Sequence, residues 1–140
     1  AMEKLNTAID LNPWNSIAYE TRAFVHIKLG NLEKAEKDAR KAIELDPTLL
    51  AAVANMGDVH RLKGEVAGAQ SLYMDVIKRV GAMSQSERYM SDYEAAISAE
   101  RGLRKMGIGV EPKFEKEAIG RNILSERLIR IKHDGMPPNS

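Results

Sequence analysis

The chain has 140 residues, of which 44% are hydrophobic and 29% are charged, which is enough apolar material for the core of one ordinary domain. Its 21 basic and 20 acidic side chains nearly cancel, so net charge draws it neither to nucleic acid nor to an anionic membrane surface. It has no cysteine, which excludes disulfides and thiolate metal sites and is compatible with a reducing compartment.

The first residues of the chain follow a helical pattern. Apolar residues recur at three-to-four spacing up to Ile9, and Pro13 predicts that this helix ends just before it. Residues 8–13 read Ala-Ile-Asp-Leu-Asn-Pro and residues 42–47 read Ala-Ile-Glu-Leu-Asp-Pro. The same motif, ending in proline, is therefore repeated. A period of about 34 residues is typical of stacked helix pairs. Because the opening helix has no partner before it, we expect either a fragment of a longer protein or a truncated first repeat.

Two helix pairs follow the opening helix. Apolar periodicity predicts one pair at 16–29 and 32–46, separated by a Gly-Asn turn and ended by a proline. A second pair follows directly at 52–63 and 66–80, and each of its helices ends at a glycine, Gly64 or Gly81. The sequence therefore predicts two consecutive helix-turn-helix units at 16–49 and 50–83, preceded by half a unit at 1–15.

These units resemble the tetratricopeptide repeat, a helix-turn-helix of about 34 residues with aromatic, small and proline residues at fixed offsets. In the unit at 16–49 the matching residues are Tyr19, Ala23, Gly30, Ala35, Ala39, Ala42 and Pro47. In the weaker copy at 50–83 they are Met56, Gly57, Gly64, Ala69, Tyr73 and Val76. Residues 1–15 fit the second helix of an earlier repeat, so residues 1–82 carry about two and a half repeats. The resemblance implies an all-α fold, a right-handed α-solenoid of antiparallel helix pairs.

The period fails after residue 83. The segment Ser84 to Glu87 indicates a capping box that opens a helix running to about Lys105. Pro112 suits the first turn of a last helix that ends near Lys132. We expect these two longer C-terminal helices, within residues 84–134, to form a cap or a divergent repeat that covers the last apolar face. Residues 135–140 contain two prolines and are expected to form a loose tail.

The resemblance also implies a binding surface. Equivalent first helices of stacked repeats line one concave face, and here that face mixes apolar and charged residues in a way that suits an extended or helical peptide. The candidate partner-binding residues are Ile17, Glu20, Thr21, Phe24, Ile27, Lys28, Asn55, Asp58, Arg61 and Leu62. The alternative is that Ile17, Phe24 and Ile27 merely pack against a neighbouring helix.

One branch of the family clamps the C-terminal carboxylate of heat-shock chaperones with lysine, asparagine and arginine on successive first helices. Asn55 occupies an asparagine-type position here, but Thr21 holds the equivalent place one repeat earlier. Ala51 stands where a lysine is expected. The resemblance therefore does not carry this clamp over to the chain.

No motif in the sequence predicts catalysis, a cofactor or a metal. His26 and His60 lie one repeat apart, but a zinc site requires four convergent ligands. Both histidines also occupy a position where the family usually has tyrosine. Residues 107–109 read Gly-Ile-Gly without the preceding strand and further glycines of a dinucleotide loop. No nucleophile, base and stabilising group occur together, so we do not expect an enzyme.

The sequence therefore predicts a noncatalytic adaptor that binds a protein or peptide on the concave face. One alternative is self-association, through the unpaired opening helix or through the apolar residues Ile123, Leu124, Leu128 and Ile131. Another is binding of RNA or an acidic partner by the basic residues Arg121, Arg127, Arg130 and Lys132. A polar outer helix face explains this basic cluster equally well, and the absence of interleaved aromatic residues disfavours nucleic acid.

The sequence also bears on membranes and targeting. No apolar run approaches the roughly 20 residues that span a bilayer, so membrane insertion is not expected. The start of the chain lacks the apolar stretch of a secretory signal. A cytoplasmic location is the resulting expectation.

Overall fold

Helix ends coincide with the prolines and glycines of the repeat pattern. The computed structural model describes residues 1–123 and residue 127. Pro13 and Pro47 each follow closely on the end of a helix, because proline disfavours the helical conformation of the residue before it. Gly30 and Gly64 follow the first helix of each pair with φ of 80° and 82°, the left-handed conformation that glycine adopts without steric cost. The helices are α1 (Met2–Leu11), α2 (Ser16–Leu29), α3 (Leu32–Leu45), α4 (Leu50–Leu62), α5 (Val66–Ala82), α6 (Met90–Lys105) and α7 (Lys113–Gly120), with a 3-10 turn at Gln85–Glu87.

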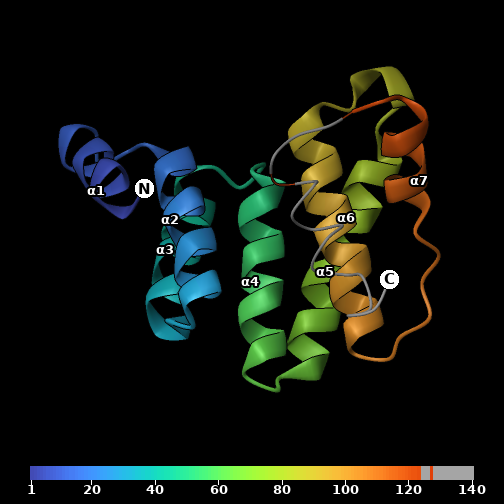
Figure 1. Ribbon diagram of the computed structural model, residues 1–140, viewed down its shortest axis with the longest axis horizontal. Coiled ribbons are helices and arrows are strands. Elements are labelled where there is room, and N and C mark those ends of the chain that lie inside the picture. Colours follow the sequence, from blue (N-terminus) through green and yellow to red (C-terminus); the bar gives the residue numbers. More distant parts are fainter. Residues whose placement is uncertain (124–126, 128–140) are drawn as a thin grey trace.

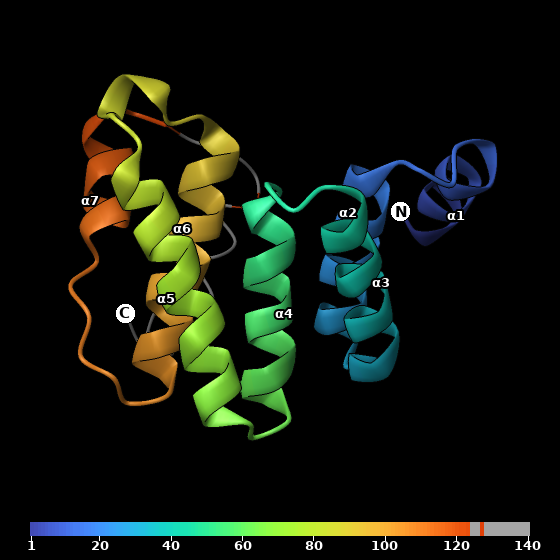
Figure 2. The ribbon, with the colours of Figure 1, turned by 180° about the vertical axis from the view of Figure 1, so that it is seen from behind.

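The helices are arranged in two layers. In Figure 1, α2, α4 and α6 lie in front of α3 and α5, and Figure 2 shows the same layers from behind. Helix α4 packs against α2 and α3 on one side and against α5 and α6 on the other. Helix α1 contacts α2, and α7 contacts α6. We call the surface of α2, α4 and α6 that faces away from α3 and α5 the concave face.

Most of the hydrophobic core lies between α4, α5, α6 and α7. Its largest fully buried apolar side chains are Tyr73, Tyr93, Phe114 and Leu103. A smaller cluster of Ala23, Ala39 and Met56 joins α2, α3 and α4. Alanine suits this second cluster because small side chains let helix axes approach closely.

Two glycines enclose the ring of Tyr73. A Cβ atom added at Gly57 of α4 would lie 2.7 Å from the ring, and one added at Gly102 of α6 would lie 2.2 Å from it. Real side chains do not approach so closely, so a residue with a Cβ atom does not fit at either position. Gly57 belongs to the small positions of the repeat pattern, whereas no repeat match indicated Gly102.

The helix expected to begin at Ser84 begins later. Ser84 and Glu87 do form a capping box, in which the Ser84 backbone N–H donates to Glu87 Oε2 at 3.0 Å, but the box closes only the 3-10 turn. Arg88 then takes an extended conformation, with φ −80° and ψ 120°, and α6 begins at Met90. Helices α2 and α4 begin at Ser16 and Leu50, one repeat period apart, so α6 begins later than this period would place it.

The helix expected to run from Pro112 to about Lys132 is much shorter within the described residues. Helix α7 ends at Gly120, and Asn122 takes a positive φ of 54°, which breaks the helix. Ile123 packs against the core. The rest of the expected helix, apart from Arg127, and the expected tail at 135–140 lie outside the described residues.

The all-α fold is confirmed, since every regular element between residues 1 and 123 is helical. Helix α6 packs against α4 and α5 as α4 packs against α2 and α3, so helix pairs stack in the manner of a solenoid. Within the described part of the chain, no helix has both the length and the apolar character that crossing a membrane requires.

Candidate partner-binding face

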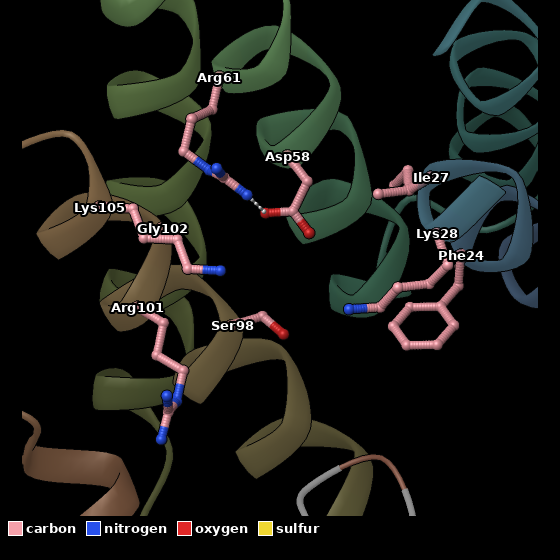
Figure 3. A pocket seen from close by; sticks show the side chains of 9 residues that line it. All are labelled: Phe24, Ile27, Lys28, Asp58, Arg61, Ser98, Arg101, Gly102 and Lys105. Atoms are coloured by element: carbon pink, nitrogen blue, oxygen red, sulfur yellow. Dashed lines mark ion pairs between the residues drawn. The ribbon is translucent and has the colours of Figure 1, made fainter. Parts of the chain in front are cut away.

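A shallow hollow, open to solvent, lies on the concave face. Three helices contribute to it: α2, α4 and α6 (Figure 3). The lining residues are Phe24, Ile27, Lys28, Asp58, Arg61, Ser98, Arg101, Gly102 and Lys105. All five that come from α2 and α4 are among the residues expected from the sequence, so α2 and α4 do present these side chains together.

The charge around the hollow is mainly positive. Lys28 of α2 and Lys105 of α6 point into the space between their helices (Figure 3), and both are exposed. Arg101 turns away from this space, and its Nη2 donates to Glu115 Oε1 at 2.5 Å. Asp58 is the carboxylate that lines the hollow. A segment with negative charges would therefore meet complementary charge here.

A buried polar network fixes Asp58 beneath the hollow. The Tyr73 hydroxyl donates to Asp58 Oδ1, and Arg61 Nε donates to the Tyr73 oxygen at 3.1 Å. Arg61 Nη2 also lies 3.7 Å from Asp58 Oδ1 (Figure 3). Burial raises the pKa of Asp58, and the contacts with Tyr73, Arg61, Lys105 and Lys28 only partly offset this.

The raised pKa of Asp58 predicts a pH-dependent stability. The folded state binds the Asp58 proton more tightly than the unfolded state, so this contribution is present in full below the unfolded pKa of about 3.9 and is lost as pH rises through the folded pKa. We expect the free energy of unfolding of the wild type, minus that of Asp58→Asn, to fall as pH rises above about 4. Urea unfolding of both proteins between about pH 4 and pH 8 measures the difference. Asp10→Asn, which changes an exposed carboxyl of α1, is the control, and a difference that grows with pH would contradict the assignment.

Asn55 has a structural contact rather than a free amide. It is buried, and its Nδ2 donates to the backbone oxygen of Glu20 at 3.1 Å, which joins α4 to α2. Thr21, in the equivalent place one repeat earlier, has its hydroxyl within 3.3 Å of Glu20 Oε2. Both side chains therefore contact Glu20 within the chain.

Five of the ten expected residues do not line the hollow, and two of these five, Ile17 and Leu62, lie at helix ends. Ile17 at the start of α2 is 65% exposed, and Leu62 at the end of α4 is 46% exposed; neither lines it. Helix α2 begins at Ser16 and α4 ends at Leu62, so both residues occupy helix ends. The hollow gathers side chains from the middle and C-terminal turns of α2 instead.

Glu20 and Thr21 contact a residue far along the chain. Arg127 donates to both carboxylate oxygens of Glu20, and its Nη2 lies 3.4 Å from Thr21 Oγ1. Its guanidinium carbon also lies 4.5 Å from the centroid of the Phe24 ring. The sequence interpretation placed Arg127 in a basic cluster, explained by a polar outer helix face or by an outside partner, and missed this internal contact.

The basic cluster of the C-terminal part is divided in the structure. Arg121 donates to the backbone oxygen of Gln85 at 2.8 Å and to the Tyr93 hydroxyl at 2.9 Å. Arg127 contacts α2, as described above. Arg130 and Lys132 lie outside the described residues. Of the apolar residues suggested for self-association, only Ile123 is described, and it is partly buried against the core.

The two histidines have separate partners. The Nε2 atom of His26 lies 3.8 Å from Asp38 Oδ2, within an ion pair whose other member is Arg22. His60 pairs with Glu65 at the turn before α5. Each histidine therefore packs within its own helix pair. In residues 1–123 and 127, no three histidine or acidic side chains gather as metal ligands would.

Sequence reasoning missed the contribution of α6. Ser98, Arg101, Gly102 and Lys105 lie outside the repeat period, because α6 begins later after α4 than α4 begins after α2. The amphipathic pattern that predicted α6 could also have indicated its contribution to the hollow. Had that helix been placed in the same layer as α2 and α4, Lys105 would have joined the candidates.

Comparisons with known proteins point to one family. The tetratricopeptide repeat model matches residues 16–49. The chain is 32% identical over 96 residues to small glutamine-rich tetratricopeptide repeat-containing protein 2 of Saccharomyces cerevisiae, a match that covers 69% of this chain and 28% of that protein. It is 38% identical over 73 residues to Hsp70-Hsp90 organizing protein 2 of Arabidopsis thaliana, covering 52% of this chain and 13% of that protein.

A third similar protein is the SGT1 homolog of Oryza sativa subsp. japonica, 46% identical over 57 residues, covering 41% of this chain and 16% of that protein. The chain thus spans between 13% and 28% of the length of these three relatives. No solved structure gives a significant match. The matched repeat at residues 16–49 coincides with α2 and α3, and α4 and α5 form the next helix pair, so this is a chain that carries tetratricopeptide repeats.

Proposed function

We propose that the protein is a noncatalytic adaptor whose concave face binds an acidic segment of another protein. The observation that carries this proposal is the hollow between α2, α4 and α6, into which Lys28 and Lys105 point from opposite walls. Phe24 and Ile27 supply apolar surface beside these cations. Apolar anchors with a few flanking charges are the usual means by which a helical groove holds a peptide.

The shape of the hollow favours a peptide over a small metabolite. Pockets for small molecules bury most of their ligand, whereas this hollow is open along the concave face. Side chains of an extended segment can enter such a groove one after another while its backbone stays partly in water. A second, smaller hollow lies beside the first and shares Phe24 and Ser98 with it.

The relatives agree with an adaptor role. The Arabidopsis protein is named for organizing Hsp70 and Hsp90, two other proteins. A wheat relative is also named Hsp70-Hsp90 organizing protein, and a yeast relative is named heat shock protein STI1. The chain matches only a part of each, so its own partner is proposed from the chemistry of the hollow and not from these names.

The test is peptide binding by the wild type and by a variant that neutralises both cations. Fluorescein-labelled acidic, neutral and basic decapeptides are titrated and followed by anisotropy. We expect the wild type to prefer the acidic set and the Lys28→Gln, Lys105→Gln variant to bind it about tenfold more weakly, a loss of about 1.4 kcal/mol. The loss should shrink as salt is added, because salt screens exposed charges.

The matched control is Lys41→Gln, Lys78→Gln. Both lysines are exposed, Lys41 on α3 and Lys78 on α5, in the other layer of helices, and the double substitution removes the same net charge. We expect its affinity to stay within about twofold of the wild type. Equal losses in the two variants, or no preference of the wild type for acidic peptides, would contradict the proposal.

A further inference from the structure

Three side chains of α2 surround the guanidinium of Arg127. Arg127 Nη1 donates to Glu20 Oε1, and Nη2 donates to Glu20 Oε2 at 2.9 Å. The Thr21 hydroxyl oxygen lies 3.4 Å from Nη2, and the Phe24 ring lies under the guanidinium with its centroid 4.5 Å from Cζ. One residue is therefore held by a two-point ion pair, a hydroxyl and an aromatic face at the same time.

This set of contacts is specific for arginine. The planar guanidinium presents two parallel N–H groups that match the two oxygens of a carboxylate, and it stacks on an aromatic ring. A lysine ammonium offers a point charge and cannot make the paired contact. Burial lowers the pKa of Arg127, but the Glu20 carboxylate more than reverses this, so the group stays charged.

Glu20 needs such a partner. Its side chain is only 4% exposed, and a carboxylate removed from water is costly unless it is paired. The Thr21 hydroxyl supplies one neutral donor, and Arg127 supplies the positive charge. The two residues are 107 positions apart in the chain, so only the tertiary structure brings them together.

Arg127 lies in the wall of the concave face. The residues around it come from α2, α4 and α6 and include Phe24, Asn55, Glu94 and Ser98. Phe24 and Ser98 also line the neighbouring hollow. A partner that fills the whole concave face would therefore contact the place where Arg127 sits.

We propose that Glu20, Thr21 and Phe24 form a guanidinium-binding site on the concave face, which Arg127 of the same chain occupies as an internal ligand. The site accepts an arginine side chain of a peptide when Arg127 is absent or displaced. It differs from the cationic hollow in chemistry, since its charge is negative, and it stands whether or not the hollow binds acidic peptides.

The occupancy of the site by Arg127 is tested by NMR on the full chain. The Nε–Hε signal of Arg127, assigned by its loss in Arg127→Lys, should be sharp and shifted in the wild type and should move to the position of exposed arginines in Glu20→Gln. Arg127→Ala should shift the backbone amides of Glu20, Thr21 and Phe24. The control Arg40→Ala removes an arginine that is 62% exposed and should leave these amides unchanged.

The ligand class is tested by adding a capped Gly-Arg-Gly peptide to Arg127→Ala at millimolar concentration. We expect the amides of Glu20, Thr21 and Phe24 to return toward their wild-type positions. Capped Gly-Lys-Gly should have at least several-fold less effect, and the arginine peptide should have none on Arg127→Ala, Glu20→Gln. Amides that do not respond to Arg127→Ala would overturn the internal contact. No response to the arginine peptide, or an equal response to the lysine peptide, would overturn the guanidinium site.

Discussion

Replacing Gly102 with alanine is expected to lower the free energy of unfolding by about 2 kcal/mol, the balance of roughly 3 kcal/mol of overpacking and roughly 1 kcal/mol gained in helix propensity. The new Cβ would lie 2.2 Å from Tyr73 Cζ and 2.5 Å from its hydroxyl oxygen. The ring cannot move aside, because it is fully buried and its hydroxyl is bonded to Asp58 and Arg61. Urea unfolding measures the loss as a lower midpoint.

Gly68→Ala is the matched control for this prediction. Gly68 also lies inside a helix, α5, but a Cβ there would meet the His60 ring at 3.4 Å, an ordinary contact. We expect this variant to equal or exceed the wild type in stability, since alanine favours a helix over glycine. Tyr73→Leu should make the Gly102→Ala substitution less costly, because the shorter side chain leaves room for the added methyl group. Equal costs of Gly102→Ala in both backgrounds would exclude the ring as the cause.

Replacing Glu100 with alanine is expected to cost about 2 kcal/mol and to release α7 from α6. Glu100 is buried in α6 and accepts from the backbone N–H of Phe114 at 3.0 Å and of Glu115 at 3.3 Å, the first turn of α7. Helix termini leave such N–H groups without partners inside the helix. Alanine would leave the buried backbone N–H of Phe114 without an acceptor, and the Phe114 ring belongs to the main core.

Hydrogen exchange resolves where this stability is lost. We expect the amides of α7 to lose protection in Glu100→Ala by at least about tenfold, while those of α2 and α3 stay unchanged, because α7 packs mainly against α6. Glu100→Gln keeps one acceptor oxygen and should lose about half as much stability. Glu111→Ala removes an exposed carboxylate just before α7 and serves as the control. A uniform loss of protection across all helices would argue against a local role for Glu100.

The repeat pattern predicted the first five helices correctly, because their ends depend on local chemistry. Gly30 and Gly64 adopt a conformation that other residues rarely take, and Pro47 excludes helix from the residue before it. The pattern also identified half of the hollow. Phe24 and Asp58 come from equivalent first helices, whose stacking the family resemblance implied.

The C-terminal part could not be predicted in the same way. The capping box at Ser84 and Glu87 is present, but it closes a short turn, since Arg88 turns its side chain toward the backbone oxygens of Val80 and Met83. Helix α7 ends at Gly120, well short of the end that the apolar pattern indicated for it. In both places a local signal is compatible with several lengths, and tertiary contacts decide between them.

The sequence by itself determined the first five helices, their turns and their pairing, because the repeat period encodes contacts between neighbours in the chain. Only the tertiary structure decided what completes the concave face. Helix α6 enters the face although it begins outside the repeat period, and Arg127 reaches Glu20 across 107 positions. Such contacts join residues with no fixed spacing in the sequence, so a periodic pattern cannot predict them. The charge of the face is positive at Lys28 and Lys105 and is balanced where Arg127 pairs with Glu20, and both features depend on these long-range contacts.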